Sequence, residues 1–313
     1  MYDPTKPYKK EILKLIRETW DTPFLSIKKD IYPIIKKRFS YREIDHTDGI
    51  GTKGVYHWKK KTFKNAVLDT LAMNLNDLLL LRAQPYKLQN HIILPEDDKR
   101  AILEMIKTLV RECRKRKIAI TGGETSIQDN IEGIDISLTV SGFIKEQKPN
   151  LARIGDKIIG LKSNGLHSNG FTKVREVFKR KFKSDFTLPS NIYWDKIYKL
   201  NQYFDIHGMM HITGGAFSKL KDFLKGTSAR IKSNHQLLPQ KIFREIYRKG
   251  ISDEEMYKTF NCGIGFLLTT SSQDVNKIIS SLKKFKAEVI GEIVSGDKRI
   301  EIESMFSKKI IRL

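Results

Sequence analysis

Four glycine-bearing polar clusters, each following an apolar run, constrain the fold of this chain more than any other feature of its sequence. They occupy residues 48–53 (DGIGTK), 120–125 (ITGGET), 164–171 (NGLHSNGF) and 211–217 (HITGGAF). Glycine lets the backbone turn tightly and approach a ligand closely. An apolar run that ends in such a cluster is typical of a strand that is followed by a loop at the edge of a sheet.

The first cluster has the composition of a loop that binds both phosphate and a metal ion. Asp48 is suited to a hard cation and Lys53 to phosphate oxygens, while Gly49 and Gly51 allow the backbone to come close. The hexapeptide is neither a Walker motif nor a dinucleotide fingerprint, and by itself it is more often an ordinary turn. Its functional interpretation depends on the three clusters that follow.

Residues 65–82 (NAVLDTLAMNLNDLLLLR) predict a long helix that is apolar on most of its surface and therefore buried. Asp69, Asn76 and Asp77 interrupt this surface, and Asp69 and Asn76 are seven positions apart, so they share a face. A buried carboxylate is costly unless it is paired or binds a metal. These groups could simply cap neighbouring loops, but for Asn76 and Asp77 we favour a functional role.

The remaining periodicity predicts alternating helices and strands. Apolar spacing favours helical structure over residues 10–39, with a break at Pro23. Residues 118–120 are expected to form a strand that runs into the loop 121–125, which places Glu124 beside permissive backbone at a sheet edge. Further strands are predicted at 91–94, 134–143, 155–161, 263–270, 288–293 and 299–303, and further helices at 96–117, 172–182, 192–204, 218–224, 241–248, 253–260 and 272–286.

A polar segment at residues 145–153, which contains Pro149, marks the predicted domain boundary. We therefore expect domains at 1–147 and 148–313, each long enough to bury its own core. In the second domain His167 lies between two glycines of a candidate phosphate loop. For this histidine a catalytic and a structural role are equally consistent with the sequence.

Composition excludes several classes of protein. Hydrophobic residues make up 40% and charged residues 30% of the 313, which is typical of a globular chain. No apolar run is long enough to cross a bilayer, and residues 1–10 contain no apolar signal core, so we expect a cytoplasmic protein without membrane association. Cys113 and Cys262 lack metal-ligand spacing, which argues against structural zinc and a disulfide framework.

The net charge of +22 raises a nucleic-acid hypothesis. The basic residues are scattered over many short groups, and no aromatic residues interleave with them in a stacking pattern. The sequence therefore disfavours nucleic acid as a partner and favours lysine-rich solvated surfaces. Such a charge would still attract phosphorylated substrates.

Six motifs occur in the order and approximate spacing that characterise one enzyme family. They are TDGIGTK, LDTLAMNLNDLL, ITGGET, SNGLHSNGF, HITGGAF and EEMYKTFNCGIGF, spread over about residues 41–303. In this pattern the chain resembles the aminoimidazole ribonucleotide synthetases, also called phosphoribosylformylglycinamidine cyclo-ligases, of the PurM-like superfamily. The last motif and LHSNG are more similar to this family than to selenophosphate synthetase, thiamine-monophosphate kinase or the hydrogenase maturation factor.

The resemblance implies an α+β chain with a two-domain PurM-like fold. The N-terminal domain would bind ATP and metal, and its sheet would pair across a homodimer to complete a β-barrel. The C-terminal domain, a mixed sheet with flanking helices, would bind the phosphate of the phosphoribosyl substrate.

The resemblance also implies ATP and Mg²⁺, and a ring-closing reaction of purine biosynthesis. ATP would phosphorylate the formyl oxygen of formylglycinamidine ribonucleotide, after which the amidine nitrogen attacks that carbon and phosphate leaves. Activating this oxygen requires mainly charge neutralisation and positioning, so no protein nucleophile is needed.

When the motif positions of the family are matched to this sequence, the resemblance implies site residues in both domains. Asp48, Asp77 and Glu124 match acidic positions suited to Mg²⁺, and they are expected to converge on one cleft of the N-terminal domain, faced by His167. His167, Asp77 and Lys53 match positions expected to act in catalysis. Nucleotide and phosphate contacts are expected from Asp48, Gly49, Gly51, Thr52, Lys53, Asn76, Gly122, Gly123, Glu124, Ser168, Asn169, Thr213, Gly214 and Gly215.

The chain departs from the family pattern, and two rival functions stay open. Residues 1–40 contain no glycine where the family has a glycine-rich segment, residues 82–85 read RAQP in place of Gly-Ala-Glu-Pro, and SIQD follows GGET in place of an acidic-Met-Pro continuation. One rival is another ATP-dependent phosphotransferase of the same superfamily. The other is a non-catalytic paralogue that binds nucleotide or nucleic acid.

Overall fold

The structure, a computed structural model, describes residues 8–313, which form two compact units. The N-terminal unit takes in the chain up to Leu78 together with Ala83–Gln147, and the C-terminal unit takes in Leu79–Arg82 and Lys148–Leu313. Residues 1–7, where the predicted N-terminal domain and its polar terminus begin, lie outside the described residues. Within the described part, no helix has both the length and the apolar character needed to cross a bilayer.

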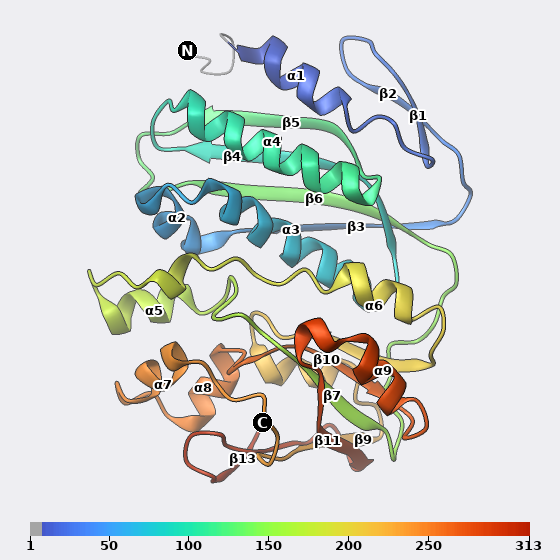
Figure 1. Cartoon of the computed structure of the whole chain (residues 1–313), viewed down its shortest axis with the longest axis vertical. Coiled ribbons are helices and arrows are strands. Elements are labelled where there is room, and N and C mark those ends of the chain that lie inside the picture. The colour runs from blue at the N-terminus through green and yellow to red at the C-terminus, as the bar shows by residue number, and fades with distance from the viewer. Residues whose placement is uncertain (1–7) are drawn as a thin grey trace. The chain divides into compact units, whose positions relative to one another are not determined.

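The N-terminal unit is built on a four-stranded mixed sheet in the order β3-β6-β4-β5. β6 is antiparallel to both of its neighbours, whereas β4 and β5 are parallel. Figure 1 shows α3 and α4 lying along this sheet. The elements are α1 (Lys9–Arg17), β1 (Leu25–Lys28), β2 (Ile34–Lys37), β3 (Arg42–Gly49), the 3-10 helix η2 (Gly51–Lys53), α2 (Gly54–Lys60), α3 (Phe63–Leu80), β4 (Gln84–Leu94), α4 (Lys99–Arg116), β5 (Ala119–Ile127) and β6 (Asp135–Ile144).

The two faces of this sheet differ in polarity. Along β4, Leu88 and Ile92 are buried, whereas Gln89 and His91, which lie between them in the chain, are exposed. This alternation is that of a strand with one covered and one solvated face. The predicted long apolar helix is confirmed as α3, in which several leucines, such as Leu71, are fully buried.

The helical prediction over residues 10–39 is correct only for its first part. After α1, β1 and β2 form an antiparallel hairpin in which Ile27 pairs with Ile35. Phe24 and Phe39 flank this hairpin and pack on the ring of Phe143, at centroid distances of 5.3 and 4.3 Å. The prediction failed because β-branched residues favour strands, and because tertiary aromatic packing decided between the two conformations.

The predicted loop after residue 120 is also wrong, because β5 continues as a strand to Ile127. The prediction of a short strand at residues 91–94 was likewise too narrow, since β4 begins at Gln84. Parallel pairing with β4 accounts for both differences, since Asn90 pairs with Gly123 and His91 with Glu124. The glycines therefore lie within the sheet.

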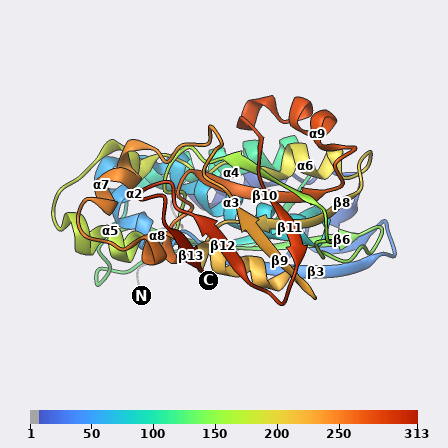
Figure 2. The same ribbon diagram turned by 90° about the horizontal axis from the view of Figure 1, so that it is seen from below.

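The C-terminal unit contains a seven-stranded mixed sheet in the order β13-β12-β9-β11-β7-β10-β8. β12 and β9 are parallel and the other pairs antiparallel. Figure 2 shows β9, β11 and β12 side by side. The elements are β7 (Lys157–Lys162), α5 (Phe171–Phe178), η3 (Ser184–Thr187), α6 (Trp194–Leu200), β8 (Ile206–His211), η4 (Ala216–Asp222), β9 (Thr227–Ile231), α7 (Lys241–Tyr247), α8 (Asp253–Thr259), β10 (Ile264–Thr270), α9 (Val275–Ser281), η5 (Lys283–Phe285), β11 (Glu288–Ser295), β12 (Ile300–Glu303) and β13 (Ile310–Arg312).

The predicted α+β fold class is confirmed, with a mixed sheet and flanking helices in the C-terminal unit. The sequence did not predict β8, β9 or β13. It placed a helix at residues 218–224, where the structure has the 3-10 helix η4.

Candidate active site

The first glycine cluster forms the turn between β3 and α2. Asp48 and Gly49 end β3, and the side chain of Asp48 accepts a hydrogen bond from the backbone N–H of Gly49 at 2.7 Å. Gly51 has a φ of +57° with open space around it, so the turn uses the left-handed backbone that glycine favours. At Gly54 a side chain would overlap the carbonyl oxygen of Ile134, a packing requirement that the sequence analysis missed.

Lys53 lies in the core of the N-terminal unit. Its ammonium is 2.9 Å from Oδ1 and 2.8 Å from Oδ2 of Asp69, and Nε2 of His57 is 2.8 Å from the same Oδ2. All three side chains are fully buried. The network ties η2 and α2 to α3, and so fixes the turn that carries Asp48.

The ionisation of this network follows from its burial and its internal charges. Burial by itself raises the pKa of Asp69, but the charge of Lys53 and the hydrogen bond with His57 outweigh it and lower that pKa to about 2. Burial also lowers the pKa of Lys53 and of His57, against the attraction of Asp69. The expected direct contact of Lys53 with phosphate is contradicted, because its ammonium is enclosed and bound to Asp69.

A second polar cluster joins the end of β3 to α3. Nδ2 of Asn74 donates to the backbone carbonyl of Asp48 at 3.0 Å, and Nδ1 of His46 lies 3.2 Å from Oδ1 of Asn74. The other ring nitrogen of His46 is 3.6 Å from Oδ2 of Asp77. The side chains of His46 and Asp77 are 29% and 16% exposed, so this cluster reaches solvent, whereas Asn76 is fully buried.

His46 and Asn74 are further candidate site residues that the sequence did not predict. A usable signal was present in both cases. His46 is two positions before Asp48 and so lies on the same face of β3. Asn74 is three positions before Asp77 and so neighbours it on the helix surface.

Glu124 lies at the opposite edge of the sheet from Asp48. Gly49 pairs with Ser137, Ser137 with His91, and His91 with Glu124, so one row crosses all four strands. Three strand spacings of about 4.8 Å separate its ends by roughly 14 Å. Mg²⁺ ligands lie about 2.1 Å from the ion, so one ion cannot bind both edges.

The predicted convergence of Asp48, Asp77 and Glu124 on one cleft is therefore wrong for a single chain. Consistent with this, the described residues include no group of three or more His, Cys, Asp or Glu side chains arranged to hold a metal ion. The physical reason is the strand order, which the sequence did not reveal. β3 and β5 are the two edges of the sheet.

Gly122 and Gly123 make room for Asn90 of the neighbouring strand. Nδ2 of Asn90 donates to the carbonyl of Gly122 at 3.3 Å, and a side chain at Gly123 would overlap the Asn90 amide. Beside them Glu124 is exposed, and its Oε1 accepts from the N–H of Thr125 at 3.0 Å. The carboxylate is thus available at the edge of the sheet, next to backbone without side chains.

In the C-terminal unit His167 belongs to a packed ring cluster. It is 1% exposed, has a φ of 60°, and its ring centroid is 6.1 Å from that of Tyr193 and 6.4 Å from that of His211. A side chain at Gly265 of β10 would overlap both His167 and Tyr193. This enclosure favours the structural interpretation of His167 over the catalytic one.

The two glycine clusters of this unit meet at Asn169 and Gly214. A Cβ on Gly214 would lie 3.6 Å from Oδ1 of Asn169. Nδ2 of Asn169 is buried and has no hydrogen-bond partner within the described residues. Nζ of Lys219, on η4, donates to Oγ1 of Thr213 at 3.1 Å, and Gly214 is exposed.

This arrangement brings an amide donor, an ammonium and exposed glycine backbone to one place. Such donors suit an anionic group such as phosphate. Gly215 has a φ of +77° and continues the turn, and Ser168 is held at 3.1 Å from the hydroxyl of Ser190. Lys219 was not predicted, and no motif in the sequence distinguishes it from the many other lysines.

Comparison with known proteins matches both units. The family described as "AIR synthase related protein, N-terminal domain" matches residues 41–144, and its "C-terminal domain" counterpart matches residues 153–303. The chain is 34% identical to a phosphoribosylformylglycinamidine cyclo-ligase of Saccharolobus solfataricus, covering 86% of this chain and 83% of the relative. A cyclo-ligase of Methanococcus vannielii is also 34% identical, with 85% and 80% covered.

Solved structures share the fold at lower identity. A thiamine-monophosphate kinase from Stenotrophomonas maltophilia has a TM-score of 0.68 at 15% identity, covering 94% of this chain and 96% of that one. The hydrogenase maturation protein HypE in complex with ATP has a TM-score of 0.66 at 16% identity, covering 94% and 90%.

Proposed function

The chain belongs to the AIR synthase related protein family, and on this premise we propose that it is an ATP-dependent phosphoribosylformylglycinamidine cyclo-ligase. It converts formylglycinamidine ribonucleotide to aminoimidazole ribonucleotide and releases ADP and phosphate. The observation that carries this proposal is the 34% identity to cyclo-ligases over most of both chains. The kinases and maturation proteins that share the fold are only 15 to 17% identical.

Asp48 and Asp77 are the carboxylates that we assign to Mg²⁺. Both belong to the cluster in which Asn74 and His46 bridge β3 and α3, and carboxylate oxygens are ligands that Mg²⁺ prefers. Bound there, Mg²⁺ would neutralise the charge of the ATP polyphosphate. Gly49, Gly51 and Thr52 would bring the backbone close to the nucleotide.

The remaining residues orient the reactants. Lys53 acts indirectly, because its buried ion pair with Asp69 fixes the turn that carries Asp48. In the C-terminal unit, Nδ2 of Asn169, the ammonium of Lys219 and the backbone of Gly214 would hold the substrate phosphate. No protein nucleophile takes part, since the amidine nitrogen of the substrate is itself the attacking group.

A homodimer is part of the proposal. β3 and β5 are long edge strands, and an unpaired edge is a template for pairing with another chain. If β3 of one copy meets β5 of the other, Glu124 of the second copy comes to the side of the sheet that carries Asp48. Light scattering of the purified protein tests the dimer, and cell fractionation tests the cytoplasmic location that we also propose.

The test of the activity is phosphate release from Mg·ATP with and without formylglycinamidine ribonucleotide, measured together with aminoimidazole ribonucleotide formation. We expect substrate-dependent release with equal amounts of phosphate and product. ATP binding without product would contradict the cyclo-ligase assignment. Phosphate release that depends on another phosphorylated metabolite, such as thiamine monophosphate, would favour a phosphotransferase of the same fold instead.

A further inference from the structure

All of the exposed residues of α4 are basic. The acidic residues of this helix, Glu104 and Glu112, are only partly exposed, and Glu112 is ion-paired with Arg116 at 2.8 Å and with Arg111 at 3.1 Å. The whole chain has 58 basic and 36 acidic residues, so a helix whose exposed residues are all basic exceeds the background composition, although Glu18 and Asp21 are exposed beside it. The exposed residues are Lys99, Arg100, Lys107, Arg111, Arg114 and Lys115.

Most of these side chains follow one stripe along the helix. Arg100, Lys107, Arg111 and Arg114 are successively seven, four and three positions apart, which are spacings of neighbours on a helical surface. At about 1.5 Å per residue the stripe is about 21 Å long. A nucleic-acid duplex carries about one negative charge per 1.7 Å of its axis, so a stripe of this length faces many phosphates.

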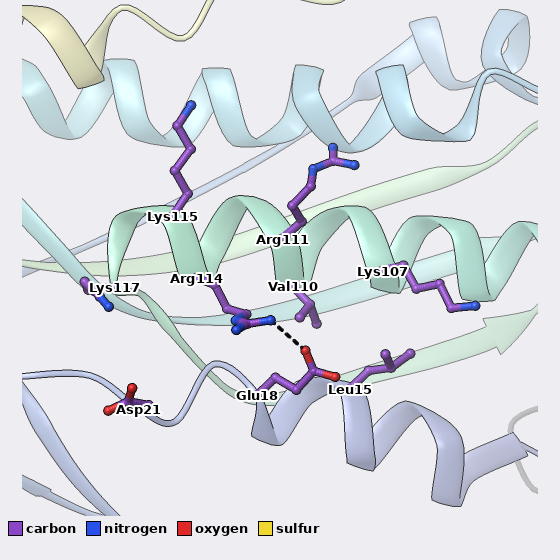
Figure 3. Close-up of a pocket in the computed structure, with 9 residues that line it drawn as sticks. All are labelled: Leu15, Glu18, Asp21, Lys107, Val110, Arg111, Arg114, Lys115 and Lys117. Carbon is purple, nitrogen blue, oxygen red and sulfur yellow. Dashed lines mark hydrogen bonds and ion pairs between the residues drawn. The ribbon is translucent and has the colours of Figure 1, made fainter.

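Two grooves flank the stripe and share Lys107 and Arg111. The first has a volume of about 600 Å³ and lies between α4 and the end of α1, where Arg114 meets Glu18 at 2.9 Å (Figure 3). The second, of about 410 Å³, adds Lys64 and Arg100. The lining of the first also includes Lys115 and Lys117.

The chemistry of the lining distinguishes between possible polyanions. Within residues 8–313, no aromatic side chain lines either groove, so the described lining offers no stacking platform for unpaired bases. Lys107 and Lys117 form no ion pair with any described residue, which leaves their ammonium groups available. Clustered Lys and Arg along a helix form the electrostatic footprint of phosphate-backbone binding.

We propose that the exposed face of α4 binds the phosphate backbone of a nucleic-acid duplex without reading its sequence. The binding is separate from the cyclo-ligase site, since no residue of this face belongs to the clusters around Asp48 or Asn169. It depends on charge and therefore weakens as salt concentration rises.

The test is fluorescence anisotropy of the full-length protein with a labelled DNA duplex of about 20 base pairs, titrated over a range of salt. The triple variant Lys107→Glu/Arg111→Glu/Lys115→Glu is expected to bind about a hundredfold more weakly at about 0.1 M salt. The slope of log affinity against log salt should also become shallower by about 3. A Gln version of the same triple should give a smaller loss in the same direction.

The matched control carries the same charge change on exposed residues of the C-terminal unit, Lys277→Glu/Lys283→Glu/Lys284→Glu. This control is expected to keep most of the affinity. Equal loss in both triples, no loss in the α4 triple, or absence of salt-dependent binding would each overturn the proposal. So would competition by poly-glutamate as effective per charge as the duplex, which would identify an acidic polypeptide as the partner.

Retained phosphate release and an unchanged thermal unfolding temperature of the α4 triple show that the variant is folded. If the Glu triple unfolds, the Gln triple replaces it in the comparison. Unchanged binding by a folded Gln triple would then count against the proposal.

Discussion

The ion pair between Lys53 and Asp69 holds the turn after β3 against α3 from inside the core. Removing one partner of a buried pair leaves the other charge without compensation. We expect Lys53→Met to lower the free energy of unfolding by about 3 to 5 kcal/mol, measured by urea denaturation. The double variant Lys53→Met/Asp69→Leu should recover part of this loss, because no buried charge is then left alone. A loss below about 1 kcal/mol in the single variant would contradict the buried geometry.

His57 gives this network a pH dependence. Its folded-state pKa lies below the 6.5 of an ordinary histidine because of burial, so the unfolded chain binds the proton more readily. Stability therefore falls as the pH drops below about 6.5, toward the folded-state pKa of His57. Asp69, with a pKa of about 2 against 3.8, adds a further loss between those two values.

The variant His57→Gln should remove the first of these losses. We expect the difference in unfolding free energy between about pH 7.5 and about pH 5.5 to be smaller in the variant than in the parent protein. Urea denaturation at both pH values measures this difference. The same difference in both proteins would show that His57 does not control stability in this range.

Gly54 and Gly51 are needed in the same turn for different reasons. Gly54 has an ordinary helical backbone, but a side chain there would overlap the carbonyl oxygen of Ile134. Gly51 has open space and only a left-handed φ. We expect Gly51→Ala to cost about 1 to 2 kcal/mol, and Gly54→Ala to cost more, because the backbone at Ile134, just before β6, would have to move. Thermal unfolding compares the two, and the reverse order would contradict this packing.

At the scale of elements, α4 depends on its N-terminal cap. The side chain of Asp98 accepts a hydrogen bond from the backbone N–H of Ala101 at 2.9 Å. We expect Asp98→Ala to lower stability by about 1 kcal/mol, whereas Asp98→Asn should be nearly neutral because asparagine caps equally well. Thermal unfolding of the two variants is the measurement. Equal losses would assign the effect to the charge of Asp98 instead of its cap.

The strand order limits which carboxylates one chain can bring to a single site. Asp48 on β3 and Glu124 on β5 belong to opposite edges, so a site that uses both must be shared between two copies. This requirement rests on the proposed dimer. In the proposed dimer, a site that adds Glu124 to Asp48 and Asp77 would be a property of the assembly, because Glu124 lies at the edge of the sheet away from Asp48.

At the scale of the whole molecule, mixed dimers test the shared site. Asp48→Asn and Glu124→Gln homodimers should each be nearly inactive in Mg·ATP-dependent phosphate release. Co-refolded mixtures should regain about a quarter of the parent activity, because half of the dimers are mixed and each then has one intact site. No recovery from mixtures that do form mixed dimers would show that both carboxylates are needed in the same chain, and would contradict the shared site.

Arg82 illustrates how a departure from the family pattern is accommodated. It has a φ of 56°, in the left-handed region that favours glycine, at the position where the resemblance leads us to expect glycine. Its guanidinium donates to the carbonyls of Ile206 and His207, at 2.8 and 3.3 Å, and to that of Lys148 at 3.2 Å. These bonds offset the backbone cost, and they were not predictable because their acceptors lie far along the chain.

The sequence by itself determined the α+β class, the buried helix α3 and the family, because periodicity and motif order are local properties of the chain. It also identified Asp48, Asp77 and the loops around Asn169 and Gly214 as candidate ligand groups. It misplaced Lys53, since nothing local distinguishes a lysine that faces phosphate from one that is buried against Asp69. It also assigned residues 24–39 to a helix, where aromatic packing selects a hairpin.

Only the tertiary structure decided which of these groups meet. Strand order separated Glu124 from Asp48, and pairing across the sheet turned a predicted glycine loop into part of β5. Folding also gathered basic residues that are scattered in sequence, such as Lys64 and Arg111, around one face of α4. The physical reason is the same in each case: contacts between distant segments depend on packing and register, which no short stretch of sequence specifies.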